Sequence, residues 1–448
     1  MNKKKFKKIA KSLVVAAYRC LTHLIPVKKG LVVFDSFMGK SYSGSVRAVY
    51  ERMAAGKTPK GFEPVWVFTR AALRKGLSES PSCRIVTYGT IGYYILMSRA
   101  SVWVFDTRHE GYLVKKKKQH YMQTWHGTPL KKLGVDIETF SMKAEKGVSA
   151  KAAGAESDKE ALAVYKEKVA AESSKWDVLL SASPFTTETF RRCFSYKGEV
   201  LECGYPRNDV LFKIDNPQAD ADKKGSQIEK SEIGSVTNGS ETIGSETTDS
   251  GNGIARKKTI LYAPTWRDDD YSGSGGWYGY DPELNIEALQ DALGDKYTLT
   301  VKLHYLVKCR KDSFPKKCIE SGFLRIADSS EDMAGLLKKT DILITDYSSV
   351  MFDFALLDRP MFFFTYDLER YRDELRGWYF DFEKEAPGPL ARDTKTLISD
   401  ILAQNDDREE KLKWQEKRKA FKERFAAFEN GHAAECAVRK IISWFGQK

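Results

Sequence analysis

The sequence predicts an α/β protein with two Rossmann-like halves that face each other across a cleft. Short apolar runs alternate with helical segments after Gly30, a pattern typical of parallel sheets covered by helices. The alternation stops between Phe212 and Tyr262, where the chain has no aromatic residue, and it resumes afterwards. A chain of 448 residues is long enough for two such domains, each with its own core.

The first half shows strands and helices in regular succession. Its expected helices are Val46–Met53 and Pro184–Cys193. Ligands of open α/β sheets bind at the carboxyl ends of strands, so functional residues are expected just after the apolar runs. The expected strands are Leu31–Phe34, Val65–Phe68, Arg84–Tyr88, Val102–Phe105, Tyr121–Thr124, Asp177–Ser181 and Val200–Cys203.

The second half repeats this pattern. After Asp393 the chain is helical and charged over Asp406–Ala427, and a short amphipathic piece follows at Cys436–Phe445. The expected helices are near Ile286–Leu293, Glu331–Leu337 and Ser349–Leu357. The expected strands are Thr259–Tyr262, Leu299–Leu303, Ile342–Thr345 and Met361–Thr365.

A segment rich in Gly, Ser, Thr and Glu separates the halves. Residues Gly225–Gly253 offer too little apolar surface to offset the entropy of ordering them, so we interpret them as a linker or an inserted loop. The expected domains are an amino-terminal segment 1–30, a first half 31–213, a linker 214–257, a second half 258–395 and carboxyl-terminal helices 396–448.

The amino-terminal segment has the pattern of a basic amphipathic helix, because apolar residues recur at i, i+3 and i+4 from Phe6 to Ile25. Residues 1–30 hold eight Lys, one Arg and no acid, which leaves 12 − 9 = +3 for the rest of the chain. The apolar run Leu13–Tyr18 is too short to span a bilayer, and Arg19-Cys20 does not fit a signal-peptide cleavage site. A helix packed on the first domain is one interpretation. We favour a helix that lies on an anionic membrane surface.

Charge and residue types argue against several function classes. The positive charge lies at one end and not along a groove, so nucleic acid is not an expected partner. Seven Cys without a C-x-x-C pair fit a reducing cytosol, and neither they nor the six His have the spacing of a metal site. No metal is therefore expected. The chain has no G-x-x-x-x-G-K-[ST] loop and no G-x-G-x-x-G fingerprint, which disfavours kinases, P-loop NTPases and nicotinamide dehydrogenases.

The strongest motif is Gln123–Gly134. His126 lies just past an expected strand, and Gly127 lets another backbone or a ligand approach closely. An imidazole can take a proton from an attacking hydroxyl near neutral pH, and Lys131 and Lys132 add positive charge. A histidine at a strand end is often structural, and this alternative stays open for His126. A second histidine, His304, ends an expected strand of the other half, so each half places one histidine at a strand exit.

Phosphate-binding groups are expected where a buried strand runs into Asp346, Ser348 and Ser349. Hydroxyls and free N–H groups at a helix start can bind phosphate, although simple N-capping by Ser348 is the alternative. Arginine is suited to bidentate phosphate contacts, although a surface role is the commoner case. Further candidates that follow strands or open helices are Arg207, Arg267 and the segment Asp328–Glu331.

These segments together resemble the CDP-glycerol glycerophosphotransferase family of teichoic acid synthesis. The resemblance covers nearly all of residues 31–390. Two departures, the Gly225–Gly253 insert and the Ala/Lys/Glu-rich stretch Ser141–Ala171, lie outside its motifs. The segments that carry it are Phe34–Ser43, Gln123–Gly134, Gly204–Asp209, Tyr262–Asp268, Val301–His304, Thr345–Ser349 and Tyr366–Pro389.

The resemblance implies a GT-B-like fold with an acceptor-side first half and a CDP-donor-binding second half. It also implies peripheral, monotopic attachment to the cytoplasmic face of the cell membrane. The catalytic pair that it implies is His126 and His304. The donor and phosphate contacts that it implies are Arg267, Asp346, Ser348 and Ser349, together with Glu331 and Arg207.

The expected activity is phosphotransfer in teichoic acid and cell wall biosynthesis. A hydroxyl of a lipid-linked polymer acceptor attacks the glycerol-bearing phosphorus of CDP-glycerol, and CMP leaves; no cofactor is expected. The alternatives are the same fold with CDP-ribitol or another nucleotide-activated donor, or a non-catalytic membrane-surface scaffold. The choice between primer enzyme and polymerase, and assembly into a homo-oligomer, are left open.

Overall fold

The structure is a computed structural model. It describes residues 3–56, 60–77, 79–138, 157–213, 256–265, 271–272, 277–278, 283–303, 313–328, 331–372 and 377–446. The chain divides into one unit of residues 1–212 and 258–448 and a second unit of residues 213–257. The expected insert Gly225–Gly253 lies outside the described residues.

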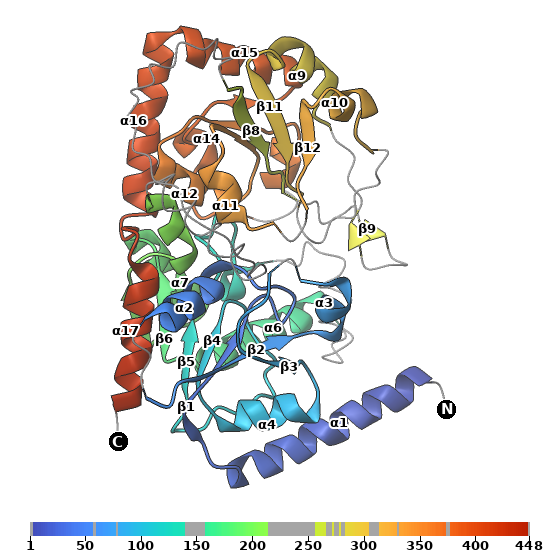
Figure 1. The fold of residues 1–448 in the computed structure, drawn as a ribbon, viewed down its shortest axis with the longest axis vertical. Helices are drawn as coiled ribbons and strands as arrows, with labels where there is room; N and C mark the ends of the chain where they lie inside the picture. The colour runs from blue at the N-terminus through green and yellow to red at the C-terminus, as the bar shows by residue number, and fades with distance from the viewer. Residues whose placement is uncertain are drawn as a thin grey trace, which may run out of the picture. The chain divides into compact units, whose positions relative to one another are not determined.

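Within the described residues, seven parallel strands form the sheet of the first half (Figure 1). They follow the order β3-β2-β1-β4-β5-β6-β7, so the order reverses between β1 and β4. All six residues of β4 are buried, as expected for a central strand covered on both faces. The strands are β1 (Lys28–Asp35), β2 (Glu63–Phe68), β3 (Arg84–Thr87), β4 (Ala100–Phe105), β5 (His120–Gln123), β6 (Val178–Ser181) and β7 (Glu199–Glu202).

The helices of the first half begin at residues suited to capping. Thr69 and Thr90 accept backbone N–H groups at the starts of two helices, and Ser157 forms a capping box with Glu160. Ser183 caps another, with Pro184 at its first position. The helices are α2 (Gly44–Ala55), α3 (Arg70–Lys75), α4 (Ile91–Arg99), α6 (Asp158–Ser173) and α7 (Pro184–Cys193), with the 3₁₀ segment η3 (Pro206–Phe212) after β7.

The second half has its own parallel sheet, of six strands in the part of the chain that the structure describes. Their order is β12-β11-β8-β13-β14-β15, and it reverses between β8 and β13. The strands are β8 (Lys258–Tyr262), β11 (Tyr297–Val301), β12 (Leu324–Ile326), β13 (Ile342–Thr345), β14 (Met361–Phe364) and β15 (Leu390–Ala391). The helices that precede or follow them are α9 (Ile286–Leu293), α10 (Lys316–Glu320), α11 (Met333–Lys338) and α12 (Val350–Phe354). A short antiparallel pair, β9 (Tyr271–Ser272) and β10 (Trp277–Tyr278), is separate from this sheet.

The carboxyl-terminal helices pack on both halves. They are α15 (Thr394–Asp406), α16 (Arg408–Phe425) and α17 (Ala433–Gly446). Phe421 and Phe425 of α16 join the core of the second half. Helix α17 lies beside α2 in Figure 1, and its Ile441 and Trp444 complete a core of the first half. The ring of Trp444 also stacks on His120, with the centroids 4.6 Å apart.

The amino-terminal helix α1 (Lys3–Leu21) runs along α4 in Figure 1. It is anchored by Tyr18, which is buried, packs against Tyr94 and accepts a hydrogen bond from the N–H of Val114 (3.1 Å). Leu13 and Leu21 of the same helix are 66% and 54% exposed. Among residues 12–21 of α1, whose side chains the structure describes, Tyr18 is the buried one and Leu13 and Leu21 face solvent. No helix in the described ranges has the length and apolar content that a bilayer crossing requires.

The two parallel-sheet α/β halves that the sequence predicts are confirmed. Every expected strand has its counterpart, with bounds that differ by at most three residues at either end. The helix expected at Ser349–Leu357 is shorter in the structure, because α12 ends at Phe354 and the 3₁₀ segment η5 (Ala355–Leu357) follows. The edge strands β12 and β15 and the helices α3, α4, α6 and α10 are among the elements that the sequence does not predict.

The linker can be tested by replacement. Residues 225–253 have no aromatic and few aliphatic side chains to contribute to a core. Replacing them with a short Gly/Ser linker is therefore expected to change the melting temperature by less than about 3 °C, since loop length alone has a small entropic cost. Thermal unfolding and turnover of the replaced protein check this. A melting temperature lowered by much more would mean that the segment packs against the rest of the chain.

Candidate active site

The loop after β1 approaches the end of β4 at the point where the strand order of the first sheet reverses. Asp35 is the last residue of β1 and Asp106 follows β4; both are buried. Asp106 accepts hydrogen bonds from the Ser36 hydroxyl (2.7 Å) and the Phe37 N–H (2.8 Å), and Asp35 accepts one from the Gly39 N–H (2.6 Å). Burial raises the pKa of Asp106 to about 7. The two carboxyl groups hold the loop in place at a ligand-binding position of the fold.

This loop has an unusual backbone. Phe37, Met38 and Gly39 have φ angles of 49°, 56° and 72°, in the left-handed region that side chains with a Cβ rarely adopt. Such conformations persist only where surrounding contacts over-determine them, and they concentrate at functional sites. The hydrogen bonds to the buried carboxyl groups of Asp35 and Asp106 supply those contacts.

His126 lies three residues beyond the end of β5, as the sequence predicts. Its Nδ1 is 2.8 Å from the carbonyl oxygen of Asp106, which can only accept, so Nδ1 carries the proton. The lone pair is thereby placed on Nε2. The ring lies 4.4 Å from Trp125 and 6.0 Å from Phe37 and keeps part of its surface exposed. Loss of hydration lowers the pKa of His126 to about 4, and the positive charges of Arg207 and Arg108 act in the same direction.

The turn that carries His126 touches the second half of the chain. Gly127 has a φ of 144°, and a Cβ at this position would lie 3.0 Å from Nη2 of Arg207 and 3.7 Å from Oγ of Ser349. Gly127 is closely approached by the side chains of Arg207 and Ser349; the approach of a backbone or a ligand that the sequence suggests stays a prediction. The structure brings three of the predicted site residues together: His126, Arg207 and Ser349.

Arg207 is engaged within the protein. Its Nη2 lies 2.8 and 2.7 Å from the two carboxylate oxygens of Asp353 in α12, and its Nη1 donates to the carbonyl oxygen of His126. The two charged side chains are only 16% and 10% exposed. Its guanidinium also lies over the ring of Tyr205. The arginine thus links the His126 turn to a helix of the second half.

The predicted phosphate-binding residues follow β13, at the reversal point of the second sheet. Asp346 is buried, and its Oδ1 accepts the N–H of Thr265 (2.8 Å), which follows β8. Ser349 occupies the N-cap position of α12 without a side-chain capping bond, and Ser348 Oγ accepts only a long bond from the N–H of Val350 (3.4 Å). The N-capping alternative therefore stays open for Ser348, whereas Ser349 has no side-chain capping bond.

Glu331 does not cap the start of a helix, although the segment Asp328–Glu331 is expected from the sequence to open one. Asp332, and not the Asp328–Glu331 segment, caps α11 by accepting the N–H of Gly335 (3.1 Å). The Glu331 carboxylate pairs with Arg325 through both oxygens, each 3.0 Å away, and accepts the N–H of Asp328 (2.7 Å). This pair is exposed. Arg267 and His304 lie outside the described residues; His304 follows directly after Leu303, the last described residue beyond β11.

Several residues near the site are absent from the sequence prediction. The signal that could have revealed Asp35 and Asp106 is a repeated Phe-Asp at the ends of two strands, Phe34-Asp35 and Phe105-Asp106. His109 lies near Asp35, with Nε2 3.6 Å from Oδ2, and neither of its ring nitrogens has a hydrogen-bond partner among the described residues. Burial lowers the pKa of His109 to about 3, so it is neutral. No sequence pattern separates it from a surface histidine.

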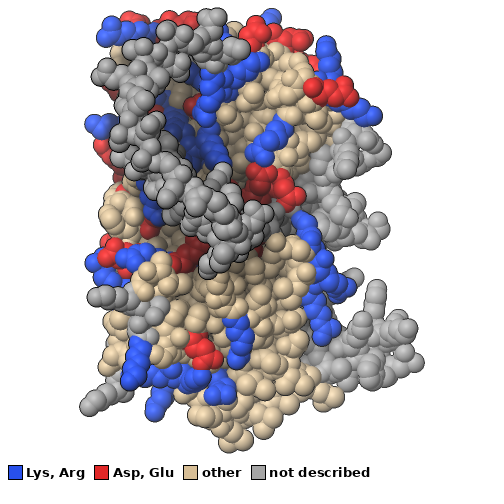
Figure 2. All heavy atoms as spheres, viewed as in Figure 1, with Lys and Arg blue, Asp and Glu red and all other residues tan. Residues whose placement is uncertain are grey.

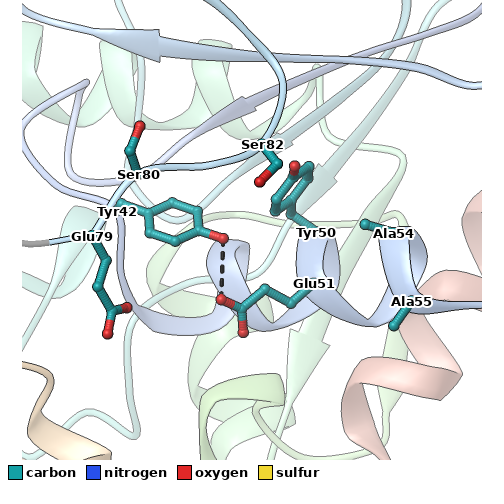
Figure 3. A pocket seen from close by; sticks show the side chains of 8 residues that line it. All are labelled: Tyr42, Tyr50, Glu51, Ala54, Ala55, Glu79, Ser80 and Ser82. Atoms are coloured by element: carbon teal, nitrogen blue, oxygen red, sulfur yellow. Dashed lines mark hydrogen bonds between the residues drawn. The ribbon is translucent and has the colours of Figure 1, made fainter. Parts of the chain in front are cut away.

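A separate depression lies over α2 (Figure 3). It has a volume of about 570 Å³ and contains none of the predicted site residues. The hydroxyl of Tyr42 points at Glu51 across its floor, 3.1 Å away. Its lining residues are Tyr42, Tyr50, Glu51, Ala54, Ala55, Glu79, Ser80 and Ser82. In the described part of the chain, no three His, Cys, Asp or Glu side chains are grouped as metal ligands. The expected independence from metal stays a prediction.

Comparison with known proteins identifies the family. The sequence matches the family described as CDP-Glycerol:Poly(glycerophosphate) glycerophosphotransferase over residues 17–232 and 236–443. A teichoic acid glycerol-phosphate transferase of Staphylococcus aureus (strain NCTC 8325 / PS 47) is 34% identical over 446 residues, 99% of this chain and 100% of that protein. A teichoic acid poly(glycerol phosphate) polymerase of Bacillus subtilis (strain 168) is 36% identical over 404 residues, 89% of this chain but 47% of the polymerase.

The fold agrees with a solved relative. The structure of the wall teichoic acid polymerase TagF aligns over 100% of this chain and 99% of that chain, with a TM-score of 0.76 and 31% identity. The two parallel-sheet halves are those of a GT-B-like protein, as the resemblance implies. With the matched segments spanning nearly the whole sequence, this chain belongs to the CDP-glycerol:poly(glycerophosphate) glycerophosphotransferase family and is an enzyme of that class.

Proposed function

We propose that this enzyme transfers glycerol phosphate from CDP-glycerol to a hydroxyl of a lipid-linked teichoic acid acceptor, with His126 as the general base. The observation that carries the proposal is the placement of His126: Nδ1 is bonded to the Asp106 carbonyl, and the turn lies against Ser349. The acceptor oxygen attacks the glycerol-bearing phosphorus and its proton passes to Nε2 of His126. The bond from that phosphorus to the bridging oxygen breaks, and the electron pair leaves with CMP.

The charge state of His126 supports this role. In the free protein its pKa is lowered to about 4, so the imidazole is neutral at physiological pH and can accept a proton. The donor brings negative phosphate charge to the site. That charge favours the imidazolium and raises the pKa toward the range in which proton transfer is efficient. The protein thus keeps the base unprotonated until the donor is bound.

The donor groups are assigned to the second half. We place the pyrophosphate near Ser348 and Ser349 at the end of β13, with Arg267 as added positive charge and His304 at the phosphate oxygens. Asp346 fixes the loop after β8 that leads to Arg267. Residues 31–213 then form the acceptor side and residues 258–395 the donor side of a cleft. Arginine and histidine side chains and the helix N-terminus can neutralise the phosphates, so we expect that no metal is essential.

Nucleotide release decides between the candidate activities. The purified enzyme is incubated with CDP-glycerol, CDP-ribitol or UDP-sugars together with lipid-linked acceptors, and release of CMP or UDP is measured. Acceptor-dependent CMP release from CDP-glycerol is the expected result. A preference for CDP-ribitol would change the donor and keep the mechanism, whereas a preference for a UDP-sugar would change the reaction to glycosyl transfer with release of UDP. No acceptor-dependent release from any donor would favour the non-catalytic scaffold.

We also propose that α1 and α4 form the surface that binds the cytoplasmic face of the cell membrane. Leu13, Leu21 and Leu24 on α1 and the segment that follows it are exposed, as is Ile91 of the adjacent α4, which is 73% exposed. The amino-terminal 30 residues carry nine positive charges, which attract anionic lipid. Over the face shown in Figure 2, Lys and Arg are instead mixed with Asp and Glu. The concentration of charge at one end supports a lipid surface as the partner.

This membrane proposal predicts the effect of three substitutions. Leu13→Glu, Leu21→Glu and Leu24→Glu together leave the buried Tyr18 anchor in place and put charge where lipid contact is proposed. We expect the triple variant to bind anionic vesicles at least about tenfold more weakly, since burying a leucine is worth about 1.5–3 kcal/mol. Vesicle sedimentation measures this, and high salt should weaken binding of the unmodified protein.

The control for this experiment is Leu412→Glu, because Leu412 is similarly exposed (49%) but lies on α16. It should bind vesicles like the unmodified protein. If the triple variant sediments with vesicles as well as the control does, the membrane surface lies elsewhere on the protein.

A further inference from the structure

The segment Gly204–Asp209, which follows β7 and enters η3, contacts three parts of the chain that are distant in sequence. The first is the loop between α16 and α17: Glu429 accepts the N–H of Tyr205 (3.0 Å) and a hydrogen bond from Asn208 Nδ2 (2.8 Å). The second is the start of α17, where Asp209 accepts the N–H groups of residues 433 and 434 at 2.9 and 2.8 Å. The third is the Arg207 contact with Asp353 and with the His126 turn.

Arg207 holds two opposite elements at once. Asp353, in α12 of the second half, receives both Nη2 bonds, and Asn208 donates a third bond to the same carboxylate (3.0 Å). The carbonyl oxygen of His126, in the first half, accepts a hydrogen bond from Nη1. The distance between the His126 turn and α12 is therefore set by the width of one planar guanidinium. A planar group with fixed donor directions constrains geometry more tightly than an ammonium can.

Burial makes this connection rigid. Desolvation alone would lower the pKa of the guanidinium, but the carboxylate of Asp353 reverses the shift, and the pKa of Arg207 is raised. Gly127 allows the contact, because a Cβ would lie 3.0 Å from Nη2. A buried ion pair with further hydrogen bonds to both partners has few alternative arrangements.

We propose that Arg207 and Asp353 are positioning residues, which hold the His126 turn in register with the start of α12 and do not bind the donor. This inference rests on the proposed role of His126. Nη1 and Nη2 of the arginine both bond to the protein in the described structure, so at least two of its five N–H groups are unavailable to a ligand. The carboxylate of Asp353 beside the guanidinium would also repel a phosphate. The segment therefore acts on the reaction through the placement of His126 relative to Ser349.

Two single substitutions separate positioning from ligand binding. Arg207→Lys keeps the charge but cannot bridge both partners, and Asp353→Asn keeps the shape but loses the charge. We expect both to lower kcat by a similar factor, about 10- to 100-fold, because a displacement near 1 Å has effects of this size. The dissociation constant of CDP-glycerol, measured by equilibrium binding, should change by less than about threefold, because neither residue touches the donor.

A donor-contact role predicts another result. Arg207→Lys would then weaken CDP-glycerol binding by tenfold or more, whereas Asp353→Asn would leave the arginine freer to bind phosphate and would bind the donor as well as the unmodified enzyme. That pair of results overturns the proposal. Equal loss of turnover with unchanged donor binding in both variants supports it.

A paired substitution guards against simple loss of stability. Arg207→Met with Asp353→Leu removes both charges, so no unpaired charge is left buried and folding is expected to survive. The carbonyl oxygen of His126 still loses the hydrogen bond from Arg207, so kcat should stay low although the melting temperature recovers. Recovery of both would show that the pair serves stability alone, and the proposal would be wrong. If the paired variant does not fold, Asp353→Asn decides, since it changes no side-chain volume.

Matched controls complete the design. Arg418 of α16 is also buried (5% exposed) and pairs with Asp358, the residue that follows η5, so Arg418→Lys should lower the melting temperature without changing kcat. His126→Gln is measured in parallel. If His126→Gln retains turnover, the proposed base is wrong. If His126→Gln loses turnover while Arg207→Lys and Asp353→Asn retain it, only the positioning inference fails.

Discussion

Replacing His126 with Ala is expected to lower kcat by at least ~100-fold while the protein stays folded, since a positioned general base contributes about 10²–10⁴-fold. The imidazole makes one hydrogen bond, to the Asp106 carbonyl, and keeps part of its surface exposed, so its removal leaves no large cavity. CDP-glycerol binding should change little, because the base faces the acceptor hydroxyl. Initial rates, donor binding and melting temperature of the variant test this.

The alternative is that His126 is a structural residue of the first half. In that case His126→Ala would lower the melting temperature, and the loss of activity would follow the unfolded fraction. His432→Ala is the control, because His432 is exposed (72% of its side chain) and lies at the start of α17. A well-folded His126→Ala enzyme with near-normal turnover would falsify the base assignment.

The pH dependence gives a second readout of the same residue. As pH falls through about 4, His126 in the free enzyme becomes protonated and can no longer accept a proton, so kcat/KM should fall there. With donor bound, the phosphate charge raises the pKa, so the acid limb of kcat should lie at higher pH. An acid limb of kcat/KM near pH 7 that disappears in Asp106→Asn would instead belong to Asp106, whose pKa burial raises to about 7.

Replacing His304 with Ala is expected to lower kcat by a comparable factor, at least ~100-fold, through loss of charge stabilisation at the phosphate oxygens. His304 follows β11, which pairs with β8, and β8 pairs with β13. Because these strands are parallel, the carboxyl end of β11, which precedes His304, lies on the same side of the sheet as the carboxyl end of β13, which precedes Asp346 and Ser348. Because the donor phosphates are proposed to lie there, CDP-glycerol affinity should also fall, in contrast to the His126 variant.

His304→Gln distinguishes the two functions of this side chain. The amide can still donate a hydrogen bond to a phosphate oxygen but cannot carry a positive charge or deliver a proton. Donor affinity close to that of the unmodified enzyme with low turnover would support a charge or acid role. Normal turnover of a folded His304→Ala enzyme would remove His304 from the mechanism and leave the phosphate charge to groups such as Arg267.

The sequence predicts most of the sheet strands because their signal is local. Strand β13 was expected at Ile342–Thr345 and has those bounds, since its apolar run is continuous and flanked by polar residues. The missed strands β12 (Leu324–Ile326) and β15 (Leu390–Ala391) are edge strands of three and two residues, too short to show any periodicity. Helix α4 was missed because apolar residues occur on both its buried and exposed faces.

The site was predictable only in part. The position of His126 after a strand follows from the local pattern, and so does the proximity of Asp346 and Ser349 to a strand end. The pairing of Arg207 with Asp353 does not follow from the local pattern, because the two residues lie 146 positions apart in the chain. An acid within the apolar stretch around Asp353 indicates a buried partner, but no pattern in a single sequence identifies which basic residue it is.

The last helix of the chain has a consequence for biosynthesis. Ala437, Ile441 and Trp444 of α17 belong to the same core as Val46 and Val49 of α2, which are made long before α17. At a translation rate of about 5–20 residues per second, the roughly 230 residues between β7 and α17 take about 10–50 s to appear. During that interval the part of this core that α17 completes stays uncovered. The growing chain therefore depends on rapid completion or chaperone shielding, and a ribosome stalled before Ala433 would release an aggregation-prone fragment.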